Sequence, residues 1–319
     1  MKIAVIGAGG VGGYFGARLM EAGHEVFFIA RGSHLAALRS HGLTIEGAAG
    51  EFSLRRIHVT RDPSAVGPCD IVVMAVRCFG DEAAAAVAGP LLGPDTLVLT
   101  LQNGIDAPHR LSRRLGARRV LGGGAYIAAR LAGPGLIRVD APRVVLELAP
   151  VSGVLGPLAA EFVDVGNAAG FEVNVFSNVD VVLWRKLCLM AAFAGVSCLA
   201  RADIGSIRND PVSFGMLAAA VAEAAAVGRA AGVALGEVIE SEVMDVLARM
   251  PTGLRSSMLD DMEGGRPLEV MALSGAVARL GAEFGVAVPV HDAILARLEG
   301  ISRGRQGKPP VELPAMEGV

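Results

Sequence analysis

The sequence has few aromatic side chains and almost no excess of one charge. Aromatic residues make up 4% of the 319 residues, and 32 acidic side chains against 29 basic ones give a net charge of −3. A chain without a basic surplus or aromatic stacking platforms is a poor nucleic-acid binder, so we expect no nucleic-acid partner. The hydrophobic share of 52% excludes an intrinsically disordered chain, except at its end.

Long apolar runs and targeting segments are also missing. The longest uncharged candidate, Leu187–Ala200, spans 14 residues between Lys186 and Arg201, whereas a membrane-spanning helix needs about 20. Residues 1–6 lead directly into a structured motif rather than a signal peptide. We therefore expect a soluble, cytoplasmic protein without a membrane partner.

Cysteine is scarce, and its spacing is uninformative. Cys69, Cys78, Cys188 and Cys198 form no CxxC pair, and the six histidines are scattered singly. We expect small buried hydrophobic side chains in a reducing compartment, and no metal site.

The length predicts two domains, and the first half of the chain alternates strands with helices. This alternation is typical of a doubly wound α/β sheet, in which buried parallel strands form nearly continuous apolar runs. The expected strands are Lys2–Ile6, Glu25–Ile29, Ile71–Val76 and Thr96–Thr100, and the expected helices are Tyr14–Ala22 and Asp81–Ala88.

Short strands punctuated by Gly and Pro follow from about residue 121, and we expect them to extend the sheet in antiparallel fashion. They are Ala125–Leu131, Gly135–Val139 and Val144–Leu148, followed by a helix at Gly153–Ala169 and a last strand at Glu172–Phe176.

The strand pattern ends at Phe176, so the second domain is predicted to be all-helical. Ser177 and Asp180 resemble a capping box that starts a helix at Asn178–Val196. Further helices are expected at Pro211–Ala231, Leu235–Met250, Ser256–Met262, Glu269–Phe284 and Val290–Glu299. The predicted fold class is thus an N-terminal Rossmann-type sheet, residues 1–176, followed by an all-α substrate and dimerisation domain, residues 177–302, and a flexible tail, residues 303–319. The Ala-rich face of Gly215–Ala231 could pack within the chain or form a homodimer.

A glycine-rich motif follows the first strand. Gly7, Gly9, Gly10, Val11 and Gly12 belong to a GxGxxG match, which is weak by itself in a chain with 42 glycines. Its position between a strand and a helix gives it weight, because the N–H groups at a helix N-terminus suit a pyrophosphate. The motif indicates a dinucleotide site, with a glycine turn that binds no ligand as the alternative.

The end of the second strand carries an arginine where an NAD site carries an acid. Arg31 follows Ile29 and Ala30, and no Asp or Glu is present to bind a ribose 2′-hydroxyl. A guanidinium favours a 2′-phosphate, so we predict NADP(H), with Arg77 as a further candidate near the cofactor. An ordinary solvated strand end remains the alternative for Arg31.

The chain uses arginine almost everywhere for positive charge. Of its 29 basic residues 26 are Arg, and Lys2 and Lys308 lie near the ends, which leaves Lys186 within the body. Lysine can release a proton when burial lowers its pKa, whereas arginine stays charged. A ketone reduction needs such a proton donor. The alternative is a lysine that reaches solvent from a helix flank.

Several motifs together resemble the ketopantoate reductase (2-dehydropantoate 2-reductase) family over nearly the whole chain. They are GAGGVG at 7–12, LQNG at 101–104, LWRKL at 183–187, SSMLDD at 256–261 and RPLE at 266–269. The resemblance implies an NADPH-dependent enzyme with a Rossmann domain and a helical domain, which reduces a 2-oxo acid to a 2-hydroxy acid.

The resemblance also implies residue roles. Lys186 matches the family's general acid, Asn103 an asparagine that contacts the nicotinamide and helps place the ketone, and Glu269 an acid that orients the substrate hydroxyl and the lysine. Ser257 matches a serine that binds the substrate carboxylate, and Gln102 lies in the same cofactor-binding motif as Asn103. Each also has a structural alternative: a turn at 103–104, a helix cap at 257 and a solvated acid at 269.

Some family positions differ. Asparagines usually follow the lysine at four and eight positions, where this chain has Met190 and Ala194. Ser274 replaces an asparagine, and Met271 replaces an acid. Three hypotheses follow: reduction of ketopantoate, as in pantothenate biosynthesis; reduction of a bulkier or more apolar 2-oxo acid; or a non-catalytic NADP(H)-binding sensor.

Overall fold

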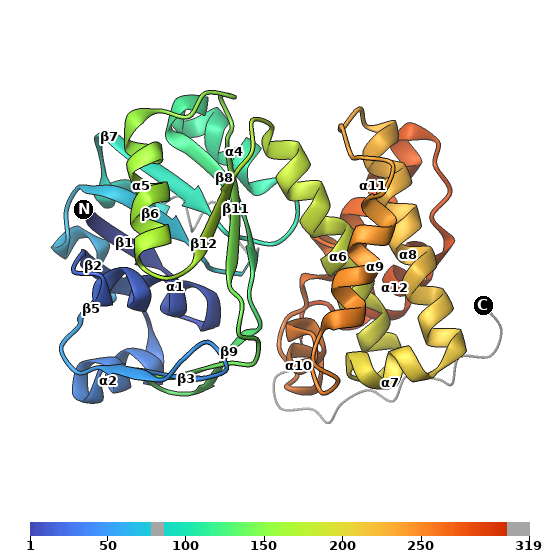
Figure 1. Ribbon diagram of the computed structural model, residues 1–319, viewed down its shortest axis with the longest axis horizontal. Coiled ribbons are helices and arrows are strands. Elements are labelled where there is room, and N and C mark those ends of the chain that lie inside the picture. Colours follow the sequence, from blue (N-terminus) through green and yellow to red (C-terminus); the bar gives the residue numbers. More distant parts are fainter. Residues whose placement is uncertain (78–85, 305–319) are drawn as a thin grey trace. The chain divides into compact units, whose positions relative to one another are not determined.

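The computed structural model describes residues 1–77 and 86–304, and the chain forms two compact units (Figure 1). The first unit comprises residues 1–183 and the second begins at Trp184. This division falls inside one helix, whereas the sequence places the domain boundary at 176/177. Most of the predicted helix Asp81–Ala88 and nearly all of the predicted tail lie outside the described residues.

An eight-stranded sheet forms the centre of the first unit. Its spatial order is β12-β11-β8-β7-β6-β1-β2-β5, and the neighbours from β8 to β5 pair in parallel. β11 is antiparallel to β8 and parallel to β12. The predicted parallel-dominated sheet and antiparallel extension are therefore confirmed, the latter through β11 alone. The strands are β1 (Lys2–Ile6), β2 (Glu25–Ile29), β5 (His58–Thr60), β6 (Cys69–Met74), β7 (Leu92–Thr100), β8 (Val120–Tyr126), β11 (Val145–Pro150) and β12 (Glu172–Val175).

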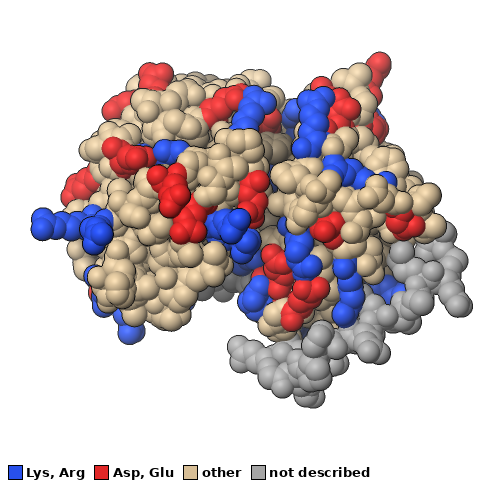
Figure 2. Space-filling model, turned by 60° about the horizontal axis from the view of Figure 1, so that its bottom comes forward, with Lys and Arg blue, Asp and Glu red and all other residues tan. Residues whose placement is uncertain are grey.

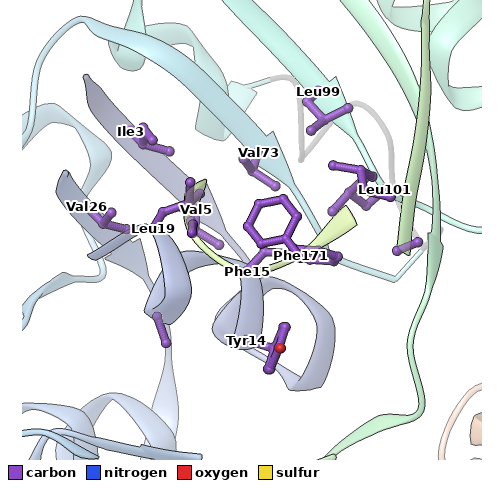
Figure 3. Packing of buried hydrophobic residues seen from close by; sticks show 14 of the residues in the cluster. Ile3, Val5, Tyr14, Phe15, Leu19, Val26, Val73, Leu99, Leu101 and Phe171 are labelled. Atoms are coloured by element: carbon purple, nitrogen blue, oxygen red, sulfur yellow. The ribbon is translucent and has the colours of Figure 1, made fainter. Parts of the chain in front are cut away.

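Hydrophobic side chains cover both faces of this sheet. Alternate residues of a strand point to opposite faces, so Ile3 and Val5 join one core cluster and Ala4 and Ile6 join another. Phe15 meets Phe171 edge to face at 4.9 Å in the first cluster (Figure 3). The first face is covered by α1 (Gly10–Glu21) and α5 (Pro157–Ala168), and the second by α4 (Ala107–Leu115).

A second, four-stranded sheet was not predicted. Its order is β4-β3-β10-β9, from β3 (Leu43–Gly47), β4 (Phe52–Leu54), β9 (Ala129–Gly133) and β10 (Leu136–Val139). The prediction of one strand at Ala125–Leu131 is wrong, because β8 ends at Tyr126 and β9 begins in the other sheet. The physical reason is packing: the start of β9 lies against Gly10, and β10 lies against Gly13 through Ile137.

All regular structure described in the second unit is helical, as predicted. The long first helix is capped by Asn178, whose Oδ1 accepts the N–H of Asp180 at 2.8 Å, so the predicted cap at Ser177 is wrong. The predicted helix Glu269–Phe284 is divided into η4 (Glu269–Met271) and α11, and α7 was not predicted. The helices are α6 (Val179–Ala200), α7 (Ile204–Asn209), α8 (Pro211–Ala230), α9 (Ile239–Arg249), α10 (Ser257–Glu263), α11 (Ser274–Phe284) and α12 (Pro289–Leu298).

Two of these helices, α6 and α8, are long and apolar enough by length and composition to cross a membrane. The uncharged stretch Leu187–Ala200 is therefore shorter than α6, the helix that contains it. In α6, 83% of the most apolar window is buried within the chain, as expected of a core helix, and in α8 the share is 50%. The lone tryptophan packs between them, because a Cβ atom on Gly228 of α8 would lie 2.8 Å from the ring of Trp184.

The described cysteines are free and buried, which confirms the prediction for Cys69, Cys188 and Cys198. Burial raises the pKa of the Cys188 and Cys198 thiols to about 12, so both stay protonated. Cys78 lies outside the described residues. Charged side chains of both signs are interspersed over the face in Figure 2, in line with the near balance of acids and bases.

Candidate active site

The glycine-rich turn after β1 uses each glycine for a different physical reason. Gly7 has a φ of +98°, which favours glycine, and a Cβ atom on Gly12 would lie 2.8 Å from the Cβ atom of Ala75. A Cβ atom on Gly10 would lie 2.7 Å from the carbonyl carbon of Ala129, so the absence of a side chain at Gly10 leaves room for the backbone of β9. Gly9 faces open space: apart from its chain neighbours, no described residue has an atom within 4 Å of an added Cβ atom.

The N-terminus of α1 is open for an anion. Gly9 occupies the N-cap position and provides no side-chain hydrogen bond, so the first N–H groups, from Gly10, Val11 and Gly12, are not capped by a side chain. These donors and the positive end of the helix dipole suit a pyrophosphate that approaches over Gly9.

His34 of α2 (Gly32–His41) forms a hydrogen bond to the backbone of this turn. Its Nε2 lies 2.7 Å from the carbonyl oxygen of Ala8, and its Nδ1 accepts the N–H of Gly135 at 3.0 Å. A backbone N–H can only donate, so Nδ1 is unprotonated and Nε2–H donates to Ala8. Burial lowers the pKa of His34, which favours this neutral form.

Two arginines gather beyond the paired ends of β2 and β5. Ile29 pairs with Thr60, and the N–H of Ala30 donates to the carbonyl of Thr60 at 3.0 Å. The chain then continues into Arg31 and Arg61, respectively. Both line an open cavity of about 460 Å³, together with Gly32 and Leu35.

Arg61 was missed because a three-residue strand gives no clear sequence signal, and only its pairing with β2 brings Arg61 beside Arg31. The N-terminus of α2 begins at the same cavity, with Arg31 as its N-cap residue. Two guanidinium groups and helix N–H groups form a cationic pocket suited to a phosphate.

The other predicted residues of the first unit follow β6 and β7. Arg77 is exposed and comes three residues after the end of β6, at the edge of the described residues. Gln102 is buried and Asn103 is half-buried, directly after β7. Gly104 has a φ of +83°, so the chain does turn here, and the turn follows a strand neighbouring β6.

Lys186 lies in the second unit on α6, and the residue is 9% exposed. Met190 and Ala194 follow at i+4 and i+8 and therefore share its helix face. Ala194 is buried and Met190 is partly buried. Lys186 is therefore buried, which contradicts the alternative interpretation of a lysine that reaches solvent from a helix flank.

The start of α10 contacts the same face of α6. Ser197, eleven residues after Lys186, has its Oγ 2.5 Å from the Oγ of Ser256. Ser256 also caps α10, since its Oγ accepts the N–H of Leu259 at 3.1 Å. The helix-cap alternative for Ser257 is thereby wrong: the cap is its neighbour, and Ser257 is exposed at the first helical position.

Glu269 and Ser274 lie inside the second unit. Glu269 is 3% exposed, so it is not a solvated acid, and Ser274 is fully buried at the start of α11. Met271 is exposed. The loop before Glu269 is fixed by an ion pair of 2.8 Å between Arg266 and the buried Asp261.

Comparison with known proteins places the chain in a family. The model described as "Ketopantoate reductase PanE/ApbA" matches residues 3–152, and the one described as "Ketopantoate reductase PanE/ApbA C terminal" matches residues 178–302. A 2-dehydropantoate 2-reductase of Mesorhizobium japonicum is 31% identical over 95% of this chain and 99% of its own length. The chain belongs to the ketopantoate reductase family.

Solved structures of ketopantoate reductases agree in fold. A 2-dehydropantoate 2-reductase from Geobacter metallireducens matches with a TM-score of 0.88 at 27% identity, covering 94% of this chain and 99% of that one. A PanE/ApbA family ketopantoate reductase from Ralstonia eutropha matches with a TM-score of 0.84 at 32% identity, covering 95% and 98%. This chain is therefore an oxidoreductase of the ketopantoate reductase family.

Proposed function

We propose that this ketopantoate reductase family member reduces a 2-oxo acid to the 2-hydroxy acid with NADPH, and that ketopantoate is its substrate. The preference for NADPH is carried by one observation: Arg31 and Arg61 line a single cavity beyond β2, without an acid at the strand end. A 2′-phosphate gains charge-assisted hydrogen bonds there, whereas a 2′-hydroxyl gains little.

The chain fits the dinucleotide in two further places. The open space at Gly9 and the uncapped N-terminus of α1 would receive the pyrophosphate. Bound NADPH supplies the hydride that reduces the ketone carbon. The chain's own residues bind and orient both partners and deliver the proton.

We assign the proton to Lys186. Its Nζ would polarise the ketone oxygen and protonate the developing alkoxide, for which a buried ammonium is well suited because low polarity strengthens the interaction. Glu269 would orient the substrate hydroxyl and the lysine, Asn103 would help place the ketone, and Ser257 would bind the substrate carboxylate. These roles follow from the residues' match to the family.

A second candidate substrate is a more apolar 2-oxo acid. It is favoured by the helix face of Lys186, where Met190 and Ala194 carry no hydrogen-bonding group. Losing a hydrogen bond to a polar substrate costs about 1–3 kcal/mol, which is enough to shift specificity. Ser274 lies at a third position where the family usually has an asparagine, and it keeps a hydroxyl there.

An NADPH-oxidation assay against ketopantoate, 2-oxoisovalerate and phenylpyruvate tests the proposal. We expect the highest kcat/KM with ketopantoate, and a preference for phenylpyruvate would favour the second candidate. Tight NADPH binding without turnover of any member would instead indicate a sensor. Replacing Lys186→Ala should abolish turnover while leaving NADPH affinity unchanged, and an active variant would remove the proposed proton donor.

Cofactor preference is tested by Arg31→Ala and Arg61→Ala. Each should weaken NADPH binding by about tenfold or more and change NADH binding little, because charged hydrogen bonds contribute about 1.5–3 kcal/mol. Arg39→Ala, at the other end of α2, is the matched control. Equal weakening of both cofactors would refute the phosphate assignment.

We also propose a cytoplasmic protein, and a homodimer that uses the outer face of α8, where Gly215, Ala219 and Ala222 are exposed. Light scattering of the purified chain measures the number of subunits, and a monomer at micromolar concentration would contradict the dimer.

A further inference from the structure

The amide of Gln102 is buried, and its carbonyl oxygen accepts a hydrogen bond from a neighbouring hydroxyl. The residue is 5% exposed, and its Oε1 lies 3.2 Å from the Oγ1 of Thr100, the last residue of β7. The same hydroxyl accepts the backbone N–H of Gln102 in a long contact of 3.5 Å. The hydroxyl proton is therefore available to Oε1, and the NH₂ group points away from Thr100.

This NH₂ group has no acceptor within the described part of the chain. The Nε2 atom is buried and makes no hydrogen bond to any described residue. Leaving a buried donor unpaired costs free energy, because its hydrogen bonds to water are lost on folding. Thr96 on the same strand shows the usual case: its buried hydroxyl donates to the carbonyl of Cys69 at 2.6 Å and accepts the N–H of Gly93 at 2.7 Å.

The sheet order says which part of a dinucleotide lies near Gln102. The pyrophosphate turn follows β1, and the Arg31 and Arg61 cavity for the adenosine half lies beyond β2 and β5, on one side of β1. β6 and β7 lie on the other side of β1. Since neighbouring strands are about 4.8 Å apart, Gln102 follows a strand roughly 10 Å from β1, on the side opposite the adenosine.

We propose that the NH₂ group of Gln102 donates a hydrogen bond to an oxygen of the nicotinamide riboside half of the dinucleotide, through a ribose hydroxyl or the carboxamide. The inference rests on the proposed function, in that a dinucleotide lies across the carboxyl ends of these strands. It assigns the unpaired donor to the cofactor and not to the 2-oxo acid. Gln102 would thus lower the stability of the cofactor-free protein and raise its affinity for the cofactor.

The variant Gln102→Met separates these effects, because it removes the donor and nearly keeps the volume. We expect about tenfold weaker NADPH binding by calorimetry, and unchanged binding of adenosine 2′,5′-bisphosphate, which lacks the nicotinamide half. The Tm of the ligand-free variant should rise by roughly 2–4 °C, because an unpaired buried donor is gone. Gln102→Glu, which keeps an acceptor but has no NH₂, should lose NADPH affinity to a similar extent.

Thr96→Val is the matched control on β7. It removes a buried hydroxyl whose bonds are satisfied, so the Tm should fall while NADPH affinity stays unchanged. The proposal is overturned if Gln102→Met weakens adenosine 2′,5′-bisphosphate as much as NADPH, if it raises only the KM of the 2-oxo acid, or if NADPH affinity is unchanged.

Failure of the NADPH proposal would be recognised separately. In that case the wild-type chain would bind adenosine 2′,5′-bisphosphate no better than ADP, and the Gln102 comparison would be made with NADH, which carries the same nicotinamide half.

Discussion

The Nε2 atom of His34 lies 2.7 Å from the carbonyl oxygen of Ala8, within the glycine-rich turn. The other ring nitrogen accepts the N–H of Gly135, between β9 and β10. One imidazole therefore fixes the turn to a strand connection more than a hundred residues further along the chain. This contact orients the Ala8 peptide, and with it the N–H groups that follow.

We expect His34→Ala to weaken NADPH binding by about tenfold and leave kcat at saturating cofactor nearly unchanged, because two hydrogen bonds that shape the turn are lost. In the variant His34→Gln the side-chain amide places a donor near the position of Nε2, and in His34→Asn it places an acceptor near the position of Nδ1. Each of these two variants should therefore restore part of the NADPH affinity. Calorimetric NADPH titration provides the measurement, with His41→Ala at the exposed end of α2 as control. Unchanged affinity in His34→Ala would show that the turn needs no such support.

Adjacent glycines of the turn should respond in opposite ways to a methyl group. Gly9→Ala places the methyl in open space, at a φ of −75° that alanine accepts, so the Tm should hold while NADPH affinity falls. Gly10→Ala forces the methyl against the backbone of Ala129 and should destabilise the protein by about 1–3 kcal/mol. Thermal melts and NADPH titrations of both variants test this, and equal effects on both quantities would contradict the assignment of roles.

His291 should make the protein sensitive to acid. The ring is fully buried on α12, its Nε2 lies 2.9 Å from the carbonyl oxygen of Ala220, and burial lowers its pKa to about 4. The unfolded chain binds a proton near pH 6.5 and the folded chain near 4, so stability is lost as the pH falls between these values. The loss amounts to about 3 kcal/mol at pH 4.

His291→Gln keeps a donor for Ala220 and has no titrating ring. The free energy of unfolding, measured in urea from pH 7 to pH 4, should fall less steeply for this variant than for the wild type. Parallel pH profiles would exclude His291 as a source of acid sensitivity.

His109 should have the opposite pH dependence. Its Nε2 lies 2.7 Å from Oδ1 of Asp180 in the first turn of α6, and this hydrogen bond raises the pKa of His109. A raised pKa means that the folded chain holds the proton more tightly, so this contribution is present below about pH 6.5 and is lost as the pH rises through the raised value. His109→Gln should flatten the dependence of the urea midpoint between pH 6 and pH 8.5, and an unchanged pH profile would contradict this role of His109.

The sequence predicted elements well where local pattern and burial coincide. Strands Lys2–Ile6 and Glu25–Ile29 were predicted with the observed bounds, because continuous apolar runs end at glycine or a charged residue. The second sheet was missed because β4 has only three residues, and because β9 and β10 are placed by packing against Gly10 and Gly13 of α1, which are distant in the sequence. The division between η4 and α11 was missed because the apolar pattern continues across Ala272 and Leu273.

The candidate site shows the same limit. The glycines, Arg31 and Lys186 stand out by motif or composition, since each is informative at its own position. Arg61 and His34 do not, because their positions depend on contacts with residues distant in the chain. The unpaired donor of Gln102 is a property of burial, which no sequence pattern records.

The support that the glycine turn receives from β9 has a consequence for dissecting this protein. The turn, its helix and Arg31 lie within the first 41 residues, yet Ala129 and Gly135 hold the turn in place. An excised N-terminal fragment would carry every letter of the nucleotide motif and lack the backbone that shapes it. Grafting the motif into another sheet would meet the same obstacle, so the transferable unit of nucleotide binding in this fold is not a contiguous segment.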